Sequence, residues 1–264
     1  MEGLWGKPFA SLDHLTSWVS TEKLPLINRE IRKAYASGLA SQWSGGGFAD
    51  SGDPEFQEVH YPGEAIKQMT SDEREAFYKL NPTQDPASCT KPYYHYLNSA
   101  QHDYLVYRKN VYFAWQHNLT LRSMDHWKQK HVSTAKIPEE IQQALPQTLN
   151  WIEQLPFKTW GRATVFGSAP FCPVPTHSDT RIRWFDDEQY PEFLFIRLGE
   201  HPKKFYIYDE QRKERHFVNS RITWFNECDY HGVAPQPRFA CSLRVDGVFS
   251  ANFRREVQKQ LKPE

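Results

Sequence analysis

The chain has 264 residues, which is enough for one domain of ordinary size with a substantial core. Lys plus Arg and Asp plus Glu each total 32, so the formal net charge is zero; this balance argues against a chain built mainly to hold nucleic acid or an anionic membrane surface. The four cysteines show no C-x-x-C spacing, which argues against a zinc ribbon or a disulfide framework and fits a reducing cytosol.

The sequence shows no sign of export or of membrane insertion. Its first ten residues, MEGLWGKPFA, lack the basic and apolar regions of a secretory signal. No stretch approaches the roughly 20 apolar residues that span a bilayer. We therefore predict a cytoplasmic protein without a membrane partner.

Residues 1–155 mix helical patterns with long polar connections, so we expect a helix-rich N-terminal part that packs on the rest of the chain. Apolar residues recur at helical spacing in two runs, and a third opens with Pro138 and two acids, which favours a helix start. Pro146 should bend or divide that third helix. The predicted helices are 24–40, 100–117 and 138–155, and the predicted loops are 41–63 and 81–92.

Residues 156–264 are dominated by short strand-like runs that turn residues separate. The predicted strands are 160–168, 191–198, 203–209, 214–218, 221–226 and 238–246. Short strands at this spacing indicate a sandwich or barrel, not alternating βα units. The predicted fold class is therefore α+β with a mainly β core, a jelly-roll over 156–264 that ends in a polar helix at 252–262.

Three side chains form a candidate metal site. His177 and Asp179 are two residues apart, so in a strand both point to the same side and can reach one ion. His231 would have to come from a neighbouring strand. Two imidazoles and one carboxylate are the facial ligand set that holds Fe(II) and leaves positions open for substrates and oxygen. The ordinary alternative is three hydrogen-bonded polar residues, but the stretch FCPVPT before His177 looks buried, where an unpaired carboxylate is costly.

Two arginines follow the distal histidine. Arg238 and Arg244 are six residues apart in one strand-like run, so both side chains should fall on one face. Arginines turned toward a barrel interior need anionic partners. A dicarboxylate cosubstrate would supply two, since the guanidinium fork grips carboxylates bidentately. The alternative places that face in solvent.

Together, His177-x-Asp179, His231 and the run from Arg238 to Arg244 resemble the Fe(II)/2-oxoglutarate-dependent oxygenase superfamily over roughly residues 160–250. The resemblance implies a double-stranded β-helix core, Fe(II) held by the three ligands, 2-oxoglutarate as cosubstrate and O2. It further implies that Arg238 binds the distal carboxylate of 2-oxoglutarate and that Arg244 assists at the 1-carboxylate. The interval from His231 to Arg238 is shorter than usual in the superfamily, which leaves the principal clamp open. Halogenating members replace the carboxylate with a small residue, so Asp179 indicates a hydroxylase type.

Other side chains near these motifs could contact substrate or cosubstrate, although each also fits an ordinary surface or core position. Two arginines alternate just beyond the His-x-Asp pair, three polar residues lie on the preceding strand, and one tryptophan precedes the distal histidine. These pocket candidates are Arg162, Thr164, Ser168, Arg181, Arg183 and Trp224.

The function predicted from the sequence is hydroxylation of an unactivated C–H bond in an amino acid, peptide residue or natural-product intermediate, with release of succinate and CO2. The expected partner is a small-molecule or peptide substrate and not a nucleic acid. A cupin-like metal enzyme that uses no 2-oxoglutarate is one alternative, and a non-catalytic β-sandwich binding protein is another. Oligomeric state and the role of the 41–63 loop stay open.

Overall fold

The computed structural model describes residues 8–39, 41–45, 62–86, 95–109, 116–126, 129–179, 192–200 and 204–261. The strands in these ranges are β1 (Phe9–Ser11), β2 (Ser41–Gly45), β3 (His95–Leu97), β4 (Gln116–Arg122), β5 (Phe157–Ser168), β6 (Val174–His177), β7 (Glu192–Arg197), β8 (Phe205–Asp209), β9 (Glu214–Phe217), β10 (Ile222–Phe225), β11 (His231–Val233) and β12 (Ala240–Phe249). The helices are α1 (Leu24–Ala36), α2 (Pro62–Lys67), α3 (Ser71–Lys79), α4 (Ser99–Asp103), the π-helix η5 (Tyr104–Arg108), α5 (Glu139–Ala144), α6 (Pro146–Ile152) and α7 (Ala251–Leu261).

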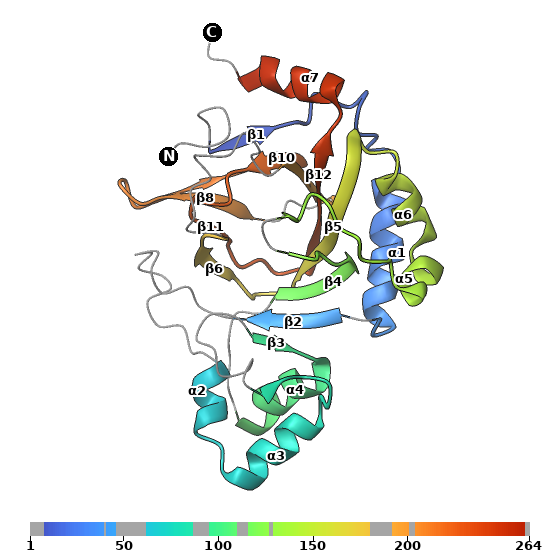
Figure 1. Ribbon diagram of the computed structural model, residues 1–264. Helices are drawn as coiled ribbons and strands as arrows, with labels where there is room; N and C mark the ends of the chain where they lie inside the picture. The colour runs from blue at the N-terminus through green and yellow to red at the C-terminus, as the bar shows by residue number, and fades with distance from the viewer. Residues whose placement is uncertain are drawn as a thin grey trace.

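The fold is mainly β, with two antiparallel sheets among the described residues (Figure 1). The larger has eight strands in the order β1-β10-β7-β12-β5-β4-β2-β3, and the smaller has four in the order β6-β11-β8-β9. From β5 onward the chain passes back and forth between the sheets, with only the β8–β9 hairpin staying in one sheet. Residues close in sequence therefore reach both walls of the space between the sheets.

Helices cover the outer face of the larger sheet (Figure 1). The apolar residues of α1 recur at helical spacing, and Leu24, Ile27 and Ile31 are fully buried. On β12, Cys241 lies on the α1 side, where its Sγ is 3.5 Å from Asn28 Oδ1. Because side chains alternate along a strand, Arg244 and its even-numbered neighbours face the opposite way, into the space between the sheets.

The proline at 146 divides the third predicted helix as expected. α5 ends at Ala144 and α6 begins at Pro146, because proline has no backbone N–H to continue the helical ladder. Trp151 of α6 donates its indole N–H to Ser20 O at 3.0 Å, which ties this helix pair to the N-terminal segment.

Two expectations for the N-terminal part were wrong. The predicted helix 100–117 ends in the π-helix at Arg108, and Gln116 already begins β4. Residues 41–45 of the predicted loop 41–63 form β2, whereas residues 46–61 lie outside the described ranges. Within β4, Leu119 and Leu121 are fully buried, and alternation sends Asn118 and Thr120 to the other face. Pairing with β5 thus favours a period of two over the helical period.

Strands β1 to β4 from the N-terminal part join the larger sheet, while the division of the chain near residue 155 stays a prediction. A small second core beside β3 joins α2, α3 and η5 through Ile66, Met69, Phe77, Leu97 and Leu105. In the part of the chain that the structure describes, no helix has the length and apolarity needed to cross a membrane.

His117 on β4 makes the stability of the fold depend on pH. Its half-buried ring lies 4.8 Å from the Tyr35 ring, and burial, aided by the charge of His102, lowers the pKa of His117 from 6.5 to about 4. Because the pKa of His117 is lower in the folded protein than in the unfolded chain, the neutral ring favours the folded state fully above pH 6.5. This contribution to the free energy of unfolding is lost as the pH falls from 6.5 toward 4. We expect this group to contribute roughly 1–2 kcal/mol of that loss, after allowance for solvent screening.

Urea unfolding at several pH values in this window should therefore show a shallower pH dependence for His117→Gln than for the wild type. Parallel curves for the two proteins would contradict the assignment of the acid sensitivity to His117.

Candidate metal centre

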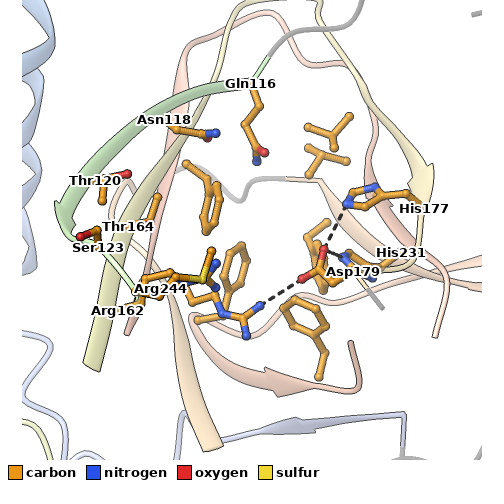
Figure 2. Close-up of a pocket in the computed structure, with 18 residues that line it drawn as sticks. Gln116, Asn118, Thr120, Ser123, Arg162, Thr164, His177, Asp179, His231 and Arg244 are labelled. Carbon is orange, nitrogen blue, oxygen red and sulfur yellow. Dashed lines mark hydrogen bonds and ion pairs between the residues drawn. The ribbon is translucent and has the colours of Figure 1, made fainter. Parts of the chain in front are cut away.

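The sheet pairing brings His177, Asp179 and His231 together (Figure 2). β6 ends at His177 and β11 begins at His231, and the two histidines are direct partners in the antiparallel register. Asp179 Oδ1 lies 3.5 Å from His177 Nε2 and 3.6 Å from His231 Nε2. Two ligands bound at right angles to one ion, each at about 2.1 Å, lie about 3 Å apart, so this spacing fits a shared metal.

The two-residue spacing suggested that Asp179 shares a strand with His177. The structure differs, because β6 ends at His177 and Asp179 lies just beyond it. The backbone N–H of Asp179 donates to Glu227 O at 3.0 Å, and this bond holds the residue beside the end of β6. The loop after β10 thus places the carboxylate that strand alternation was expected to place.

Backbone carbonyls fix the orientation of both imidazoles. His177 Nδ1 lies 2.7 Å from Pro175 O, and His231 Nδ1 lies 2.9 Å from Asp229 O. A carbonyl oxygen only accepts hydrogen bonds, so each Nδ1 carries a proton and Nε2 is the ring nitrogen that faces Asp179. Metal-ligating histidines are held by outer partners of this kind. With Nδ1 occupied, Nε2 of each ring is the nitrogen left to bind a metal.

The second oxygen of Asp179 binds an arginine. Arg244 Nη1–H donates to Asp179 Oδ2 at 3.1 Å, which leaves Oδ1 facing the two histidines (Figure 2). Burial alone would raise the pKa of Asp179, but the hydrogen bonds of His177 and His231 and the charge of Arg244 hold it well below its usual range. The carboxylate is therefore ionised, the state that a metal ligand requires.

Arg244 joins this carboxylate to a buried cluster of charges. It donates Nε–H to Asp246 Oδ1 at 3.0 Å, forms an ion pair with Glu227 through Nη2, and lies over the Phe193 ring at 3.8 Å from its centroid. Arg162 donates to Asp246 Oδ2 at 2.7 Å, and Lys130 Nζ lies 2.5 and 2.7 Å from the two oxygens of Glu227.

The charges of this cluster balance. It contains three cations (Lys130, Arg162 and Arg244) and three anions (Asp179, Glu227 and Asp246). Apart from Asp179, whose side chain is 21% exposed, each of these side chains is at most 10% exposed. Burial would lower the pKa of Arg244, but the three carboxylates outweigh burial and raise it. Removing any one member would leave the cluster with a net buried charge.

A glycine lets Lys130 reach the cluster. Arg162 N–H donates to Lys130 O at 2.8 Å, so the 130–132 segment runs against β5 beside Gly161. A Cβ at Gly161 would lie 2.1 Å from Lys130 O. Arg122 fixes the continuation of this segment by donating to Ser133 O and Ala135 O.

The triad and the two arginines of the cluster, Arg162 and Arg244, border a cavity of about 240 Å³ between the two sheets. Figure 2 shows the triad on one side and a row of neutral polar side chains opposite. That row consists of Gln116, Asn118, Thr120, Ser123 and Thr164. Four phenylalanines, Phe166, Phe195, Phe205 and Phe225, make up much of the apolar lining.

The structure brings some of the pocket candidates to this cavity but not all of them. Arg162, Thr164 and Arg244 line it. Ser168 is fully buried and not part of the lining, and Trp224 packs in the core because its neighbour Phe225 takes the cavity side of β10. Arg181 and Arg183 lie outside the described residues.

The expectation that Arg238 shares a strand face with Arg244 was wrong. β12 begins at Ala240, so Arg238 lies in the preceding loop, where it is exposed and lines a different cavity. Of the two arginines proposed as a clamp, Arg244 alone lines the cavity beside the triad.

Sequence reasoning missed Glu227, Asp246 and Lys130. Asp246 had a local signal, since it follows Arg244 by two residues in a predicted strand and so shares its face. Lys130 had none, because it lies in an irregular segment 97 positions from its partner Glu227.

Comparison with known proteins gives low similarities. No family model matches the chain, and no curated protein matches it. An oxidoreductase of the 2OG-Fe(II) oxygenase family from Burkholderia pseudomallei is 10% identical with a TM-score of 0.34, covering 50% of this chain and 67% of that one. A Pseudomonas putida prolyl-4-hydroxylase is 11% identical with a TM-score of 0.29, covering 86% and 100%.

A viral collagen prolyl hydroxylase from Paramecium Bursaria Chlorella virus-1, in a 2OG complex, is 11% identical with a TM-score of 0.28, covering 50% of this chain and 79% of that one. At TM-scores this low these likenesses carry no argument, and the function has to be inferred from the site.

Proposed function

We propose that the chain is an Fe(II)- and 2-oxoglutarate-dependent dioxygenase of the hydroxylase type, built on a double-stranded β-helix. In this proposal His177, Asp179 and His231 hold Fe(II). An unactivated C–H bond of the substrate is hydroxylated with consumption of O2 and 2-oxoglutarate and release of succinate and CO2. The passage of β5 to β12 back and forth between two antiparallel sheets supports the proposed fold.

The orientation of the two histidines is the observation that carries the proposal. Backbone carbonyls occupy both Nδ1 atoms, so the two Nε2 atoms and the carboxylate of Asp179 converge on one point. Iron bound there would supply the capacity to activate O2, and this ligand set leaves coordination positions open for the reactants.

Charge balance supports a dianionic cosubstrate. The cluster around Arg244 is neutral when Asp179 is counted, so a bound Fe(II) would leave an excess of two positive charges. A dianion such as 2-oxoglutarate would restore neutrality in this largely buried site. Arg244 is the remaining clamp candidate, and we assign it to the carboxylate nearest the metal, where its Nη1 already meets Asp179.

The lining supports a substrate that is polar but uncharged where it enters the cavity. The row opposite the triad offers amides and hydroxyls, while the charged groups of the lining are paired within the cluster. A peptide bond, an amide or a hydroxylated natural-product intermediate suits such a surface. Phe166 and Phe195 would pack against the carbon to be oxidised and exclude water from it.

A cupin-like metal enzyme without 2-oxoglutarate is the second candidate, and one observation favours it. All three carboxylates of the cluster bind Arg244, so this guanidinium has partners before any cosubstrate arrives. Such an enzyme would keep the metal ligands and need no carboxylate clamp.

Anaerobic titration of Fe(II)-loaded protein with 2-oxoglutarate tests the proposal. Chelation at a two-histidine, one-carboxylate iron site should give a weak visible charge-transfer band near ~500 nm. The band should disappear in His231→Ala and persist in His14→Ala, which removes an exposed histidine. Iron binding without the band would support the second candidate, and failure to bind iron would support a non-catalytic binding protein.

A further inference from the structure

A second cavity, of about 630 Å³, lies outside the metal centre. It is bordered by α1, by the turn after β7 and by the segment that leads into β12, and we call it the arginine cavity. Its lining residues are Pro25, Asn28, Arg32, Leu198, Gly199, Glu200, Arg221, Gln236, Arg238, Phe239, Ala240 and Cys241. None of these belongs to the lining of the metal cavity, so the two are separate sites.

The lining of the arginine cavity carries an excess of positive charge. Arg238 has an interaction of its own, and the other charged lining residues among those described are Arg32, Arg221 and one acid, Glu200. Asp13 lies nearby, but its carboxylate accepts hydrogen bonds from the backbone N–H groups of residues 221 and 222, at 2.7 to 3.0 Å. The chain as a whole is neutral, so this local excess does not follow from composition.

Two buried donors in the lining have no acceptor. Gln236 is only 7% exposed, and its Nε2 makes no hydrogen bond; the buried Nε of Arg221 makes none either. Leaving a buried N–H group without an acceptor is costly, so native proteins rarely keep one without a reason. Both groups only donate, and a ligand that satisfies them must bring acceptor oxygens.

The walls are fixed before any ligand arrives. Arg32 donates Nη2–H to Phe239 O at 3.0 Å and lies 5.5 Å from the centroid of the Phe239 ring. Gln236 O accepts from Phe171 N–H at 2.7 Å, which holds the backbone of the segment that carries the amide. Pro25, Leu198 and Phe239 add apolar surface for the body of an organic molecule.

We propose that the arginine cavity binds a small organic molecule through an oxyanion group, a carboxylate or a phosphate. The guanidinium fork matches either group with two parallel hydrogen bonds. Gln236 Nε2 supplies a further donor, and the apolar wall takes the rest of the ligand. This inference does not depend on the chemistry proposed for the metal centre.

Calorimetric titration of the full chain with two probes, phenyl phosphate and benzoate, tests the site. The probes share an aromatic body and differ in the anionic group, so their relative affinities identify which group the cavity prefers. We expect saturable one-to-one binding of at least one probe. Loss of a charge-assisted hydrogen bond in Arg32→Gln or Arg221→Gln should weaken that binding about tenfold or more.

Arg29→Gln, on the exposed side of the same helix as Arg32, and Asp179→Asn, at the metal centre, should bind as the wild type does. No saturable binding of either probe would overturn the proposal. So would binding that survives both Arg32→Gln and Arg221→Gln.

Gln236→Leu separates a binding role from a structural one. It removes a buried donor that has no acceptor, so the ligand-free protein should unfold at the same urea concentration or a higher one. Its affinity for the preferred probe should nevertheless fall several-fold. Wild-type affinity in this variant would contradict the assignment of the amide to the ligand.

Discussion

Replacing Asp179 with alanine should abolish metal-dependent turnover, with a loss of more than about a hundredfold, because loss of an outer partner of a metal ligand already costs 10–100-fold. Asp179 supplies the only carboxylate of the candidate ligand set, and its Oδ1 faces both His177 and His231. Without it, two neutral imidazoles would have to hold a dication that no anion in the ligand set neutralises. Mn(II) affinity and Fe(II)-dependent 2-oxoglutarate consumption measure the effect.

The fold should survive this change, since Arg244 keeps Glu227 and Asp246 as partners. Glu210→Ala removes an exposed carboxylate in a turn and serves as the matched control, with metal affinity and turnover expected at the wild-type level. Full activity in Asp179→Ala would exclude the proposed ligand set.

Replacing Arg244 with methionine should lower the free energy of unfolding by about 3–5 kcal/mol, the usual cost of removing one partner from a buried ion pair. The variant leaves Asp179, Glu227 and Asp246 with only Lys130 and Arg162 to balance them. It also frees Oδ2 of Asp179, so the carboxylate loses its fixed orientation. We therefore expect a 10–100-fold loss of Mn(II) affinity as well, as for other outer partners of metal ligands.

Urea unfolding and Mn(II) titration measure these two effects separately. The double variant Arg244→Met/Asp246→Asn removes one charge of each sign and should recover part of the lost stability without recovering the metal affinity. Arg212→Met, at an exposed position of the β8–β9 turn, is the control. A stability loss below about 1 kcal/mol in Arg244→Met, which is the range of exposed ion pairs, would show that the cluster does not behave as a buried network.

Local patterns in the sequence determined much of the β core. Alternation along 238–246 placed Arg244 on one face and Leu243 on the other, and β12 keeps that arrangement because its side-chain period is two. Pro146 divides the predicted helix irrespective of how that helix packs, because the missing backbone N–H is a property of proline itself. The His-x-Asp spacing and the distal histidine predicted one cluster, and strand pairing places His231 opposite His177.

Where local patterns were ambiguous, the packing of the sheet decided. Gln116 and His117 end the segment 100–117, whose apolar spacing predicted a helix, but both pair with β5 and begin β4. This choice supplies Gln116, Asn118 and Thr120 to the cavity. The tendency of a segment to form a strand depends strongly on the strand it pairs with, more than helix propensity depends on its surroundings. The sequence by itself therefore could not show that these residues form a strand and not the end of a helix.

The first residue of one strand decided between the two arginines. β12 starts at Ala240, which puts Arg244 beside the triad and leaves Arg238 in a loop at another cavity. The six-residue spacing would place both arginines on one face of a strand that contained them both. It does not show at which residue the strand begins.

The sequence by itself thus determined the type of the strands, the divided helix and the three residues that meet as a candidate metal centre. Only the tertiary structure decided their surroundings, in which Lys130 reaches Glu227 from 97 positions away and Arg244 is enclosed by three carboxylates. The physical reason is that periodicity and turn chemistry act between near neighbours in the chain. The partners of a buried charge are instead selected by desolvation, which acts only after distant segments have packed together.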